Sequence, residues 1–207
     1  MNELSLFTGA GGGVLGSKIL GWMTIGYVEI NEKANENTAR RITDGILDNA
    51  PIYVDIKTFA NSGRCEFFNG VTDIITGGFP CQDISIANNS GEVVEGIQGS
   101  RSGLWKEMAT VVGLVRPRYV LVENSPMLTT RGLGTVLRDL AVMGYNATWG
   151  MFRASDFGFK HVRERIWILA YTPSIGRDGL EEKQKIGRSI IYKQNPQEPT
   201  FGSDHIP

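Results

Sequence analysis

The amino-acid sequence predicts an α/β fold in which a largely parallel β-sheet is flanked by helices. Short β-branched or apolar segments alternate with longer segments that have the apolar spacing of helices. This alternation is typical of parallel strands joined by right-handed crossovers. Glycine-rich turns follow two of the short segments, at the end of a strand where open α/β sheets bind ligands. The chain has 207 residues, 41% of them hydrophobic, and is long enough to bury one core.

The first predicted unit runs strand, glycine loop, helix, strand, helix. Residues 4–7 predict a short buried strand, residues 8–13 a glycine-rich loop and residues 14–22 a helix that closes at a glycine. Residues 24–30 predict a second strand. An asparagine follows it and can cap a helix over residues 32–47.

The glycine loop of this unit predicts a ligand site. Glycine lets a ligand approach the backbone, and the amino end of the following helix presents free N–H groups to a carboxylate or phosphate. Glu29, near the end of the second strand, is placed to accept hydrogen bonds from ribose hydroxyls. Residues 11–16 also fit the pattern GxGxxG, so the loop alone leaves a nicotinamide dinucleotide open as the ligand.

A candidate nucleophile follows the strand predicted over residues 71–76. Two glycines turn the chain there, and Pro80 fixes φ just ahead of Cys81. A thiol just beyond the carboxyl end of such a strand lies where open α/β sheets bind ligands and is a candidate nucleophile, although a lone cysteine is most often only a small buried side chain. An earlier apolar run, residues 52–56, predicts a further short strand that has Asp55 near its end.

A candidate acid follows the next predicted strand. Residues 88–100 are polar and predict a long loop or a lid over a site, and residues 102–115 have the spacing of a helix. Residues 119–122 are apolar and lead directly into Glu123. We therefore expect Glu123 at the carboxyl edge of the sheet, beside Cys81.

The remaining residues predict one helix, two final strands and a tail. Residues 128–143 have helical spacing, and residues 145–152 and 166–171 predict the strands. A basic segment, residues 160–165, lies between the strands and by itself predicts only a solvated hairpin connection. From residue 172 onward no period is sustained, which indicates a poorly packed tail.

Composition excludes several classes of protein. The net charge is −1, so the chain is no polycation, although its second half is more basic than its first. The two cysteines, Cys65 and Cys81, form neither a disulfide framework nor a CxxC metal site. No apolar run is long enough to span a bilayer, and the start lacks the features of a signal peptide. We therefore expect a cytoplasmic protein that binds no membrane.

Five short motifs follow one another along the chain. They are Phe7-Thr8-Gly9-Ala10-Gly11-Gly12, Gly78-Phe79-Pro80-Cys81-Gln82, Arg101-Ser102-Gly103-Leu104, Glu123-Asn124-Ser125 and Arg163-Glu164-Arg165. In order and spacing they resemble the motifs of the DNA (cytosine-5)-methyltransferases, and the likeness extends from about residue 4 to residue 170. The dinucleotide hypothesis gives no account of Cys81, Glu123 and the arginines, so the methyltransferase interpretation is preferred.

The resemblance implies a Rossmann-like fold that uses S-adenosyl-L-methionine and ends in an antiparallel strand. It also implies that Cys81 attacks C6 of a cytosine flipped out of duplex DNA, while Glu123 holds N3 and the exocyclic amine. Arg165 would contact the cytosine O2, and Arg163 would support the nucleophile loop or a phosphate. His161 stands where the family often has glutamine, and it keeps a side chain that forms hydrogen bonds.

Eight residues match the family's cofactor positions, and in that pattern Glu29 binds the ribose and Asp55 the adenine amine. The eight are Phe7, Gly9, Gly11, Gly12, Glu29, Ile30, Asp55 and Leu104.

The resemblance leaves one region without a counterpart. Complete members of the family carry a target-recognition domain and two closing motifs after the paired arginines, and residues 172–207 show no such pattern. We therefore expect a catalytic domain over residues 1–171 that binds DNA weakly alone and is helped by a second chain or a homodimer. A non-catalytic relative that only binds cofactor or DNA is the alternative.

Overall fold

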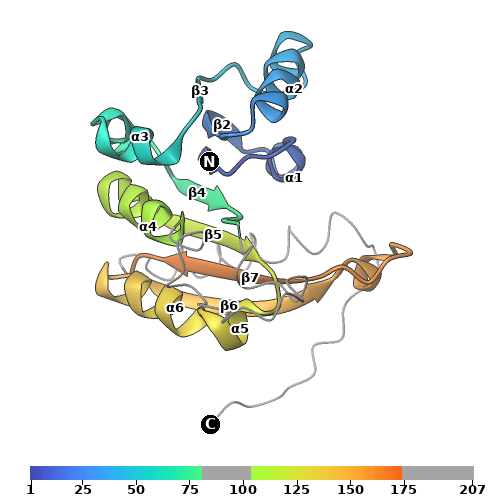
Figure 1. Ribbon diagram of the computed structural model, residues 1–207, viewed down its shortest axis with the longest axis vertical. Coiled ribbons are helices and arrows are strands. Elements are labelled where there is room, and N and C mark those ends of the chain that lie inside the picture. Colours follow the sequence, from blue (N-terminus) through green and yellow to red (C-terminus); the bar gives the residue numbers. More distant parts are fainter. Residues whose placement is uncertain (81–103, 174–207) are drawn as a thin grey trace, which may run out of the picture.

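The structure is a computed structural model that describes residues 1–80 and 104–173, and these residues form one seven-stranded sheet (Figure 1). The strand order is β3-β2-β1-β4-β5-β7-β6. Strands β1 to β5 pair in parallel, and β7 is antiparallel to both β5 and β6. This confirms the predicted α/β fold and its terminal antiparallel strand.

The strands are β1 Asn2–Leu6, β2 Met23–Val28, β3 Ile52–Tyr53, β4 Ile74–Gly77, β5 Tyr119–Asn124, β6 Asn146–Arg153 and β7 Glu164–Tyr171. The helices are α1 Gly12–Ile19, α2 Glu32–Thr43, α3 Ile56–Asn61, η1 Arg64–Phe68, α4 Leu104–Val115, α5 Leu128–Arg131, α6 Leu133–Val142 and η3 Ala154–Phe157.

Helices cover both faces of the sheet. Figure 1 shows α3, α4 and α6 on one face and α1 and α2 on the other. The largest apolar core lies on the first face, where Leu4, Val120 and Ile168 of the sheet belong to one buried cluster with Met108 and Val136 of the helices. The opposite face, under α1, holds a smaller apolar cluster together with several buried polar side chains.

Two strands are shorter than predicted, for local reasons. The strand predicted over residues 71–76 begins only with β4, because the N–H of Thr72 donates to the carbonyl of Phe68 (3.2 Å) in the turn that closes η1. The strand predicted over residues 52–56 is limited to β3, because Asp55 already caps α3.

Two helices also end or break earlier than predicted. The helix predicted over residues 32–47 ends as α2, and Gly45 follows with a left-handed φ of 70°. The helix predicted over residues 128–143 is interrupted at Gly132, which separates α5 from α6. Helices α3 and η1 have no counterpart among the predicted elements.

The last two strands form a hairpin, as predicted, with η3 in their connection. Figure 1 shows that this connection extends beyond the end of the sheet. Glu123 of β5 is opposite Trp167 of β7, and Arg165 lies two residues before Trp167. Side chains two residues apart on a strand share a face, so Arg165 and Glu123 project from the same side of the sheet.

Among the described residues, no helix is both long and apolar enough to cross a membrane. The predicted loop over residues 88–100 lies outside the described residues. The predicted tail over residues 172–207 also lies outside them, except for Thr172 and Pro173.

Candidate active site

The glycine loop after β1 bends back against the end of β2. Phe7, Gly9 and Gly11 have positive φ angles of 53°, 56° and 82°, a conformation that the two glycines adopt without strain. The N–H of Thr8 donates to the carbonyl of Val28 (3.2 Å), and the N–H of Gly11 donates to the carbonyl of Thr8 (3.1 Å). This turn places the first N–H groups of α1 at the carboxyl edge of the sheet.

Glu29 connects the loop to the start of α2. Its Oε2 accepts a hydrogen bond from the N–H of Gly9 (2.7 Å), and its Oε1 accepts one from the N–H of Asn31 (2.8 Å). The side-chain amide of Asn35 donates to the backbone carbonyl of Glu29 (2.8 Å). A carboxylate has about four acceptor sites, so the half-buried Glu29 is held in place and keeps acceptor sites for further donors.

Arg41 of α2 supports the same loop from the other side. Its guanidinium donates a hydrogen bond to the carbonyl of Ala10. A methyl group on Gly11 would lie only 3.2 Å from this guanidinium, so glycine leaves the space that the contact needs. The sequence motifs assign no role to Arg41, because the contact spans 31 residues and depends on where α2 packs.

The segments that follow β2 and β3 expose apolar side chains. Ile30 is 77% exposed and Val54 is 65% exposed. Asp55 comes next in the chain, and its carboxylate accepts hydrogen bonds from the N–H groups of Lys57 (3.1 Å) and Thr58 (3.0 Å) and from the Thr58 hydroxyl (2.7 Å). The Thr58 hydroxyl contributes most to lowering the pKa of Asp55. Asp55 therefore has a structural role as the cap of α3.

The end of β4 is packed tightly against its neighbours. A methyl group on Gly77 would lie 3.1 Å from Cε of Met108 and 3.2 Å from the carbonyl of Leu6. A methyl group on Gly78 would lie 2.8 Å from Oε2 of Glu123. Neither Gly77 nor Gly78 has a positive φ. Both positions therefore need glycine because a larger side chain would meet neighbouring atoms, and not because of the backbone conformation.

Glu123 and Arg165 form an ion pair beside Gly78. Nε of Arg165 lies 2.7 Å from Oε1 of Glu123, and both side chains are about one-third exposed. Nη1 of Arg165 also donates to the backbone carbonyl of Glu164 (2.8 Å). A pair this exposed adds little to stability. Its effect is to fix the orientation of the carboxylate and the guanidinium.

Asn124 ties the segment before Cys81 to the end of β5. Its buried side-chain amide donates to the carbonyl of Phe79 (3.2 Å), and its Oδ1 accepts from the N–H of Ser125 (2.7 Å). Cys81 itself lies outside the described residues, as do the first three residues of the Arg-Ser-Gly-Leu motif. Leu104, the last residue of that motif, begins α4 and packs against the main core.

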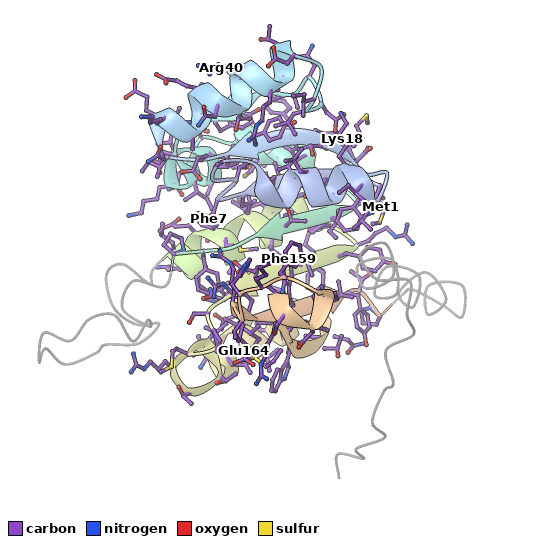
Figure 2. All side chains as sticks on the ribbon, turned by 90° about the vertical axis from the view of Figure 1, so that its right-hand side faces the viewer. Met1, Phe7, Lys18, Arg40, Phe159 and Glu164 are labelled. Carbon is purple, nitrogen blue, oxygen red and sulfur yellow. The ribbon has the colours of Figure 1, made fainter. Side chains whose placement is uncertain are left out.

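The connection between β6 and β7 presents cations and apolar side chains to solvent. Lys160, His161 and Arg163 are exposed, and Arg163 has a positive φ of 27°. Phe159 is 54% exposed, and its ring centroid lies 5.8 Å from that of His161. Figure 2 views the molecule from the side to which this connection extends, with Phe159 labelled on it.

The structure therefore brings together some of the residues that the sequence singled out. Glu123 contacts Arg165, and Glu29 contacts Gly9. Arg163 takes no part in the ion pair between Glu123 and Arg165. Within residues 1–80 and 104–173, no group of three or more His, Cys, Asp or Glu side chains is arranged to hold a metal ion.

Comparison with known proteins gives a consistent result. The family model for C-5 cytosine-specific DNA methylases matches residues 1–200. The type II methyltransferase M.Sau3AI of Staphylococcus aureus is 32% identical over 162 residues, which cover 74% of this chain and 37% of that protein. The type II methyltransferase M.CviJI of Paramecium bursaria Chlorella virus IL3A is 32% identical over 169 residues, 81% of this chain and 42% of that protein.

A solved structure shows the same fold. The crystal structure of the S. pombe Dnmt2 methyltransferase aligns with a TM-score of 0.62 and 22% sequence identity, over 83% of this chain and 49% of that chain. The chain thus spans less than half the length of each of these three proteins.

Proposed function

Because the chain belongs to the family of C-5 cytosine-specific DNA methylases, we propose that it forms the catalytic part of a DNA cytosine-5 methyltransferase. One observation supports this most. The Glu123 carboxylate and the Arg165 guanidinium, 2.7 Å apart, lie beside Gly78 at the carboxyl edge of the sheet. Cys81 follows Gly78 three residues later. A thiol, an acid and a cation are the groups that chemistry at C5 of cytosine requires.

The glycine loop fits S-adenosylmethionine, which supplies an electrophilic methyl group when bound. N–H groups at the start of α1 are oriented for its carboxylate, and Glu29 keeps acceptor capacity for its ribose hydroxyls. Ile30 and Val54 offer exposed apolar surface for its adenine ring. Asp55 has lone pairs left for the adenine amine, although its first role is to cap α3.

Cys81 acts as the nucleophile in the proposed reaction. Cytosine C5 is a poor nucleophile until another group adds to C6. The Cys81 thiolate forms a bond to C6, and the electron pair displaced toward C5 would take up the methyl group as its bond to the sulfonium sulfur breaks, so that S-adenosylhomocysteine is the leaving group. C5 then loses its proton to water, and the bond between C6 and sulfur breaks. This restores both the aromatic ring and the thiolate.

Glu123 and Arg165 orient the base in this proposal. The Glu123 carboxyl accepts a hydrogen bond from the exocyclic amine and, when it carries a proton, donates one to N3, so that negative charge developing in the ring during addition is stabilised. A guanidinium has five N–H donors, and Arg165 uses two of them in the described contacts. The others can reach the cytosine O2.

The target cytosine must leave the duplex, because its C5 and C6 atoms are inaccessible to such a site within stacked DNA. Lys160 and Arg163, exposed at the end of the hairpin, are suited to contact phosphates. With a net charge of −1 the chain has few cations to spare, and phosphate contacts supply most non-specific affinity. We propose that a second chain or a second copy of this one helps to hold the DNA.

Trapping on modified DNA tests the proposal. Cytosine carrying fluorine at C5 has no proton to lose there, so with S-adenosylmethionine present the protein should remain covalently attached to it. The adduct should form with wild-type protein and with Cys65→Ala, because Cys65 is fully buried in the core. It should be absent from Cys81→Ser. Equal adduct in Cys81→Ser would exclude Cys81 as the nucleophile. If wild-type protein binds S-adenosylmethionine but neither methylates nor traps DNA, the chain is a binding module.

A further inference from the structure

A carboxylate is buried beneath α1, on the face of the sheet that carries the glycine loop. Glu3 of β1 has no exposed surface. Its Oε1 accepts hydrogen bonds from the hydroxyls of Ser17 (2.7 Å) and Thr76 (2.6 Å), and its Oε2 accepts one from the hydroxyl of Thr24 (2.8 Å). Glu3 therefore links four elements: its own strand, α1, β2 and β4.

Burying the Glu3 carboxylate costs free energy that a side chain serving only to fill space would not cost. No Lys or Arg among the described residues forms an ion pair with Glu3, and burial raises its pKa, although the three hydroxyl bonds oppose that shift. An apolar side chain of similar size would avoid the cost of desolvating a carboxylate. An apolar residue cannot form directional hydrogen bonds, whereas the carboxylate accepts hydrogen bonds from three hydroxyl groups and so holds them at defined positions.

Helix α1 has few other anchors. It is eight residues long and contains three glycines, which weaken a helix. Only Val14 and Ser17 of this helix are buried. Besides Val14, the partly buried Leu15 and the ion pair of Lys18 with Asp48, the Ser17 hydroxyl that binds Glu3 is one of the few contacts that hold α1 on the sheet.

The two partners of Oε1 belong to the two halves of the proposed active site. Ser17 lies in the helix that begins at Gly12, directly after the glycine loop. Thr76 lies in β4, just before the glycines that lead to Cys81. We propose that Glu3 is a positioning residue that, through Ser17 and Thr76, sets the glycine loop relative to the strand leading to the nucleophile. This proposal rests on the function proposed above for the same site.

Replacing each of two threonines by valine tests whether Glu3 positions the glycine loop relative to β4. Thr76→Val removes only the hydroxyl that reaches Glu3, whereas Thr72→Val, four residues earlier, removes a buried hydroxyl without a hydrogen-bond partner in the described residues. Within the described residues the Thr76 hydroxyl donates to Glu3 and makes no hydrogen bond to α1, so a purely local role would leave the helix unchanged. We expect Thr76→Val to weaken S-adenosylmethionine binding about tenfold by calorimetry, equivalent to about 1.4 kcal/mol, and Thr72→Val to leave it unchanged.

Amide hydrogen exchange gives a readout that needs no cofactor. In Thr76→Val, and likewise in Ser17→Ala, amides of residues 8–19 should exchange faster, while those of β5 and β7 keep their wild-type rates. Equal exchange at residues 8–19 in Thr76→Val and Thr72→Val would overturn the positioning role. If wild-type protein fails to bind S-adenosylmethionine, the proposed function is wrong, and the exchange rates still decide the role of Glu3.

Glu3→Gln provides a second check that preserves shape. It retains one acceptor oxygen for Ser17 and Thr76, so cofactor affinity should stay within about threefold of wild type, equivalent to about 0.7 kcal/mol. Glu3→Leu fills similar volume without an acceptor and should show the faster exchange of residues 8–19. If Glu3→Leu binds the cofactor as tightly as Glu3→Gln, the carboxylate only fills space and the proposal fails.

Discussion

Replacing Gly78 by alanine should impair methyl transfer far more than it impairs folding. The added methyl group would lie 2.8 Å from Oε2 of Glu123, and ordinary contacts begin at 3.4 Å. The carboxylate must therefore move by about 0.6 Å, and it is held 2.7 Å from Arg165. Because the atom to be displaced ends a flexible side chain, we expect a loss of stability of only about 1 kcal/mol. A displacement approaching 1 Å at a reacting centre can reduce the rate by roughly a hundredfold.

The expected result is a fall in kcat by roughly tenfold to a hundredfold, with unchanged affinity for S-adenosylmethionine, because the substitution does not touch Glu29 or the glycine loop. The rate is measured as transfer of labelled methyl groups to DNA at saturating substrate, and stability as Tm. Gly134→Ala in α6 is the matched control, since a methyl group there meets no atom within 4 Å. Full activity in Gly78→Ala at an unchanged Tm would refute the argument that the position of the Glu123 carboxylate controls the reaction.

Three further predictions follow from single side chains. Glu29→Gln should weaken S-adenosylmethionine binding at least about tenfold in calorimetry, since a hydrogen bond to a charged acceptor is worth about 1.5–3 kcal/mol; unchanged affinity would remove Glu29 from the site. Lys160→Glu should weaken binding to duplex DNA. It should also reduce the slope of log binding constant against log salt concentration by roughly one to two. Lys33→Glu, at an exposed position of α2, should change neither quantity. Burial, with a smaller contribution from Asp48, raises the pKa of Glu3 above its ordinary value of 4.5, so the folded state binds the proton more tightly and loses stability as pH rises above 4.5. The Tm of Glu3→Gln minus that of wild type should therefore grow between pH 4 and pH 7, and a constant difference would contradict the pKa argument.

The sheet could be predicted from the sequence because its strands are apolar and separated by clear turns. The errors arose where a backbone group had a stronger local partner. Thr72 is β-branched and suits a strand, but its N–H is held by the carbonyl of Phe68. Asp55 follows an apolar run that suits a strand, but its carboxylate accepts hydrogen bonds from N–H groups at the start of α3, so the residue caps that helix and is not part of β3. The break at Gly132 could not be predicted with the same ease, because an isolated glycine is compatible with a continuous helix.

The candidate site could be predicted only where local sequence carries the signal. The glycine loop and Glu29 follow from the strand and loop pattern, and the structure places them in contact. Glu3 gives no such signal, since an acidic residue near the start of a strand is usually solvated. Arg41 is equally hidden, because nothing in an amphipathic helix indicates which of its cations faces a loop 31 residues away.

The register of the sheet gives a physical reason for the order of these groups. The strand order reverses direction between β1 and β4, and this switch point is where open α/β sheets bind ligands. Leu6 and Gly77, the last residues of β1 and β4, are partners, and Gly77 is also paired with Val122 of β5, so the three strands end within two residues of one level. A methyl donor held after β1, a thiol after β4 and the Glu123 carboxylate of β5 would then be neighbours across the sheet. Thr76 lies one residue before Gly77 and is bonded to Glu3. A shift of β4 against β1 would therefore be opposed by this hydrogen bond as well as by the strand pairing, at the point where donor and nucleophile must stay aligned.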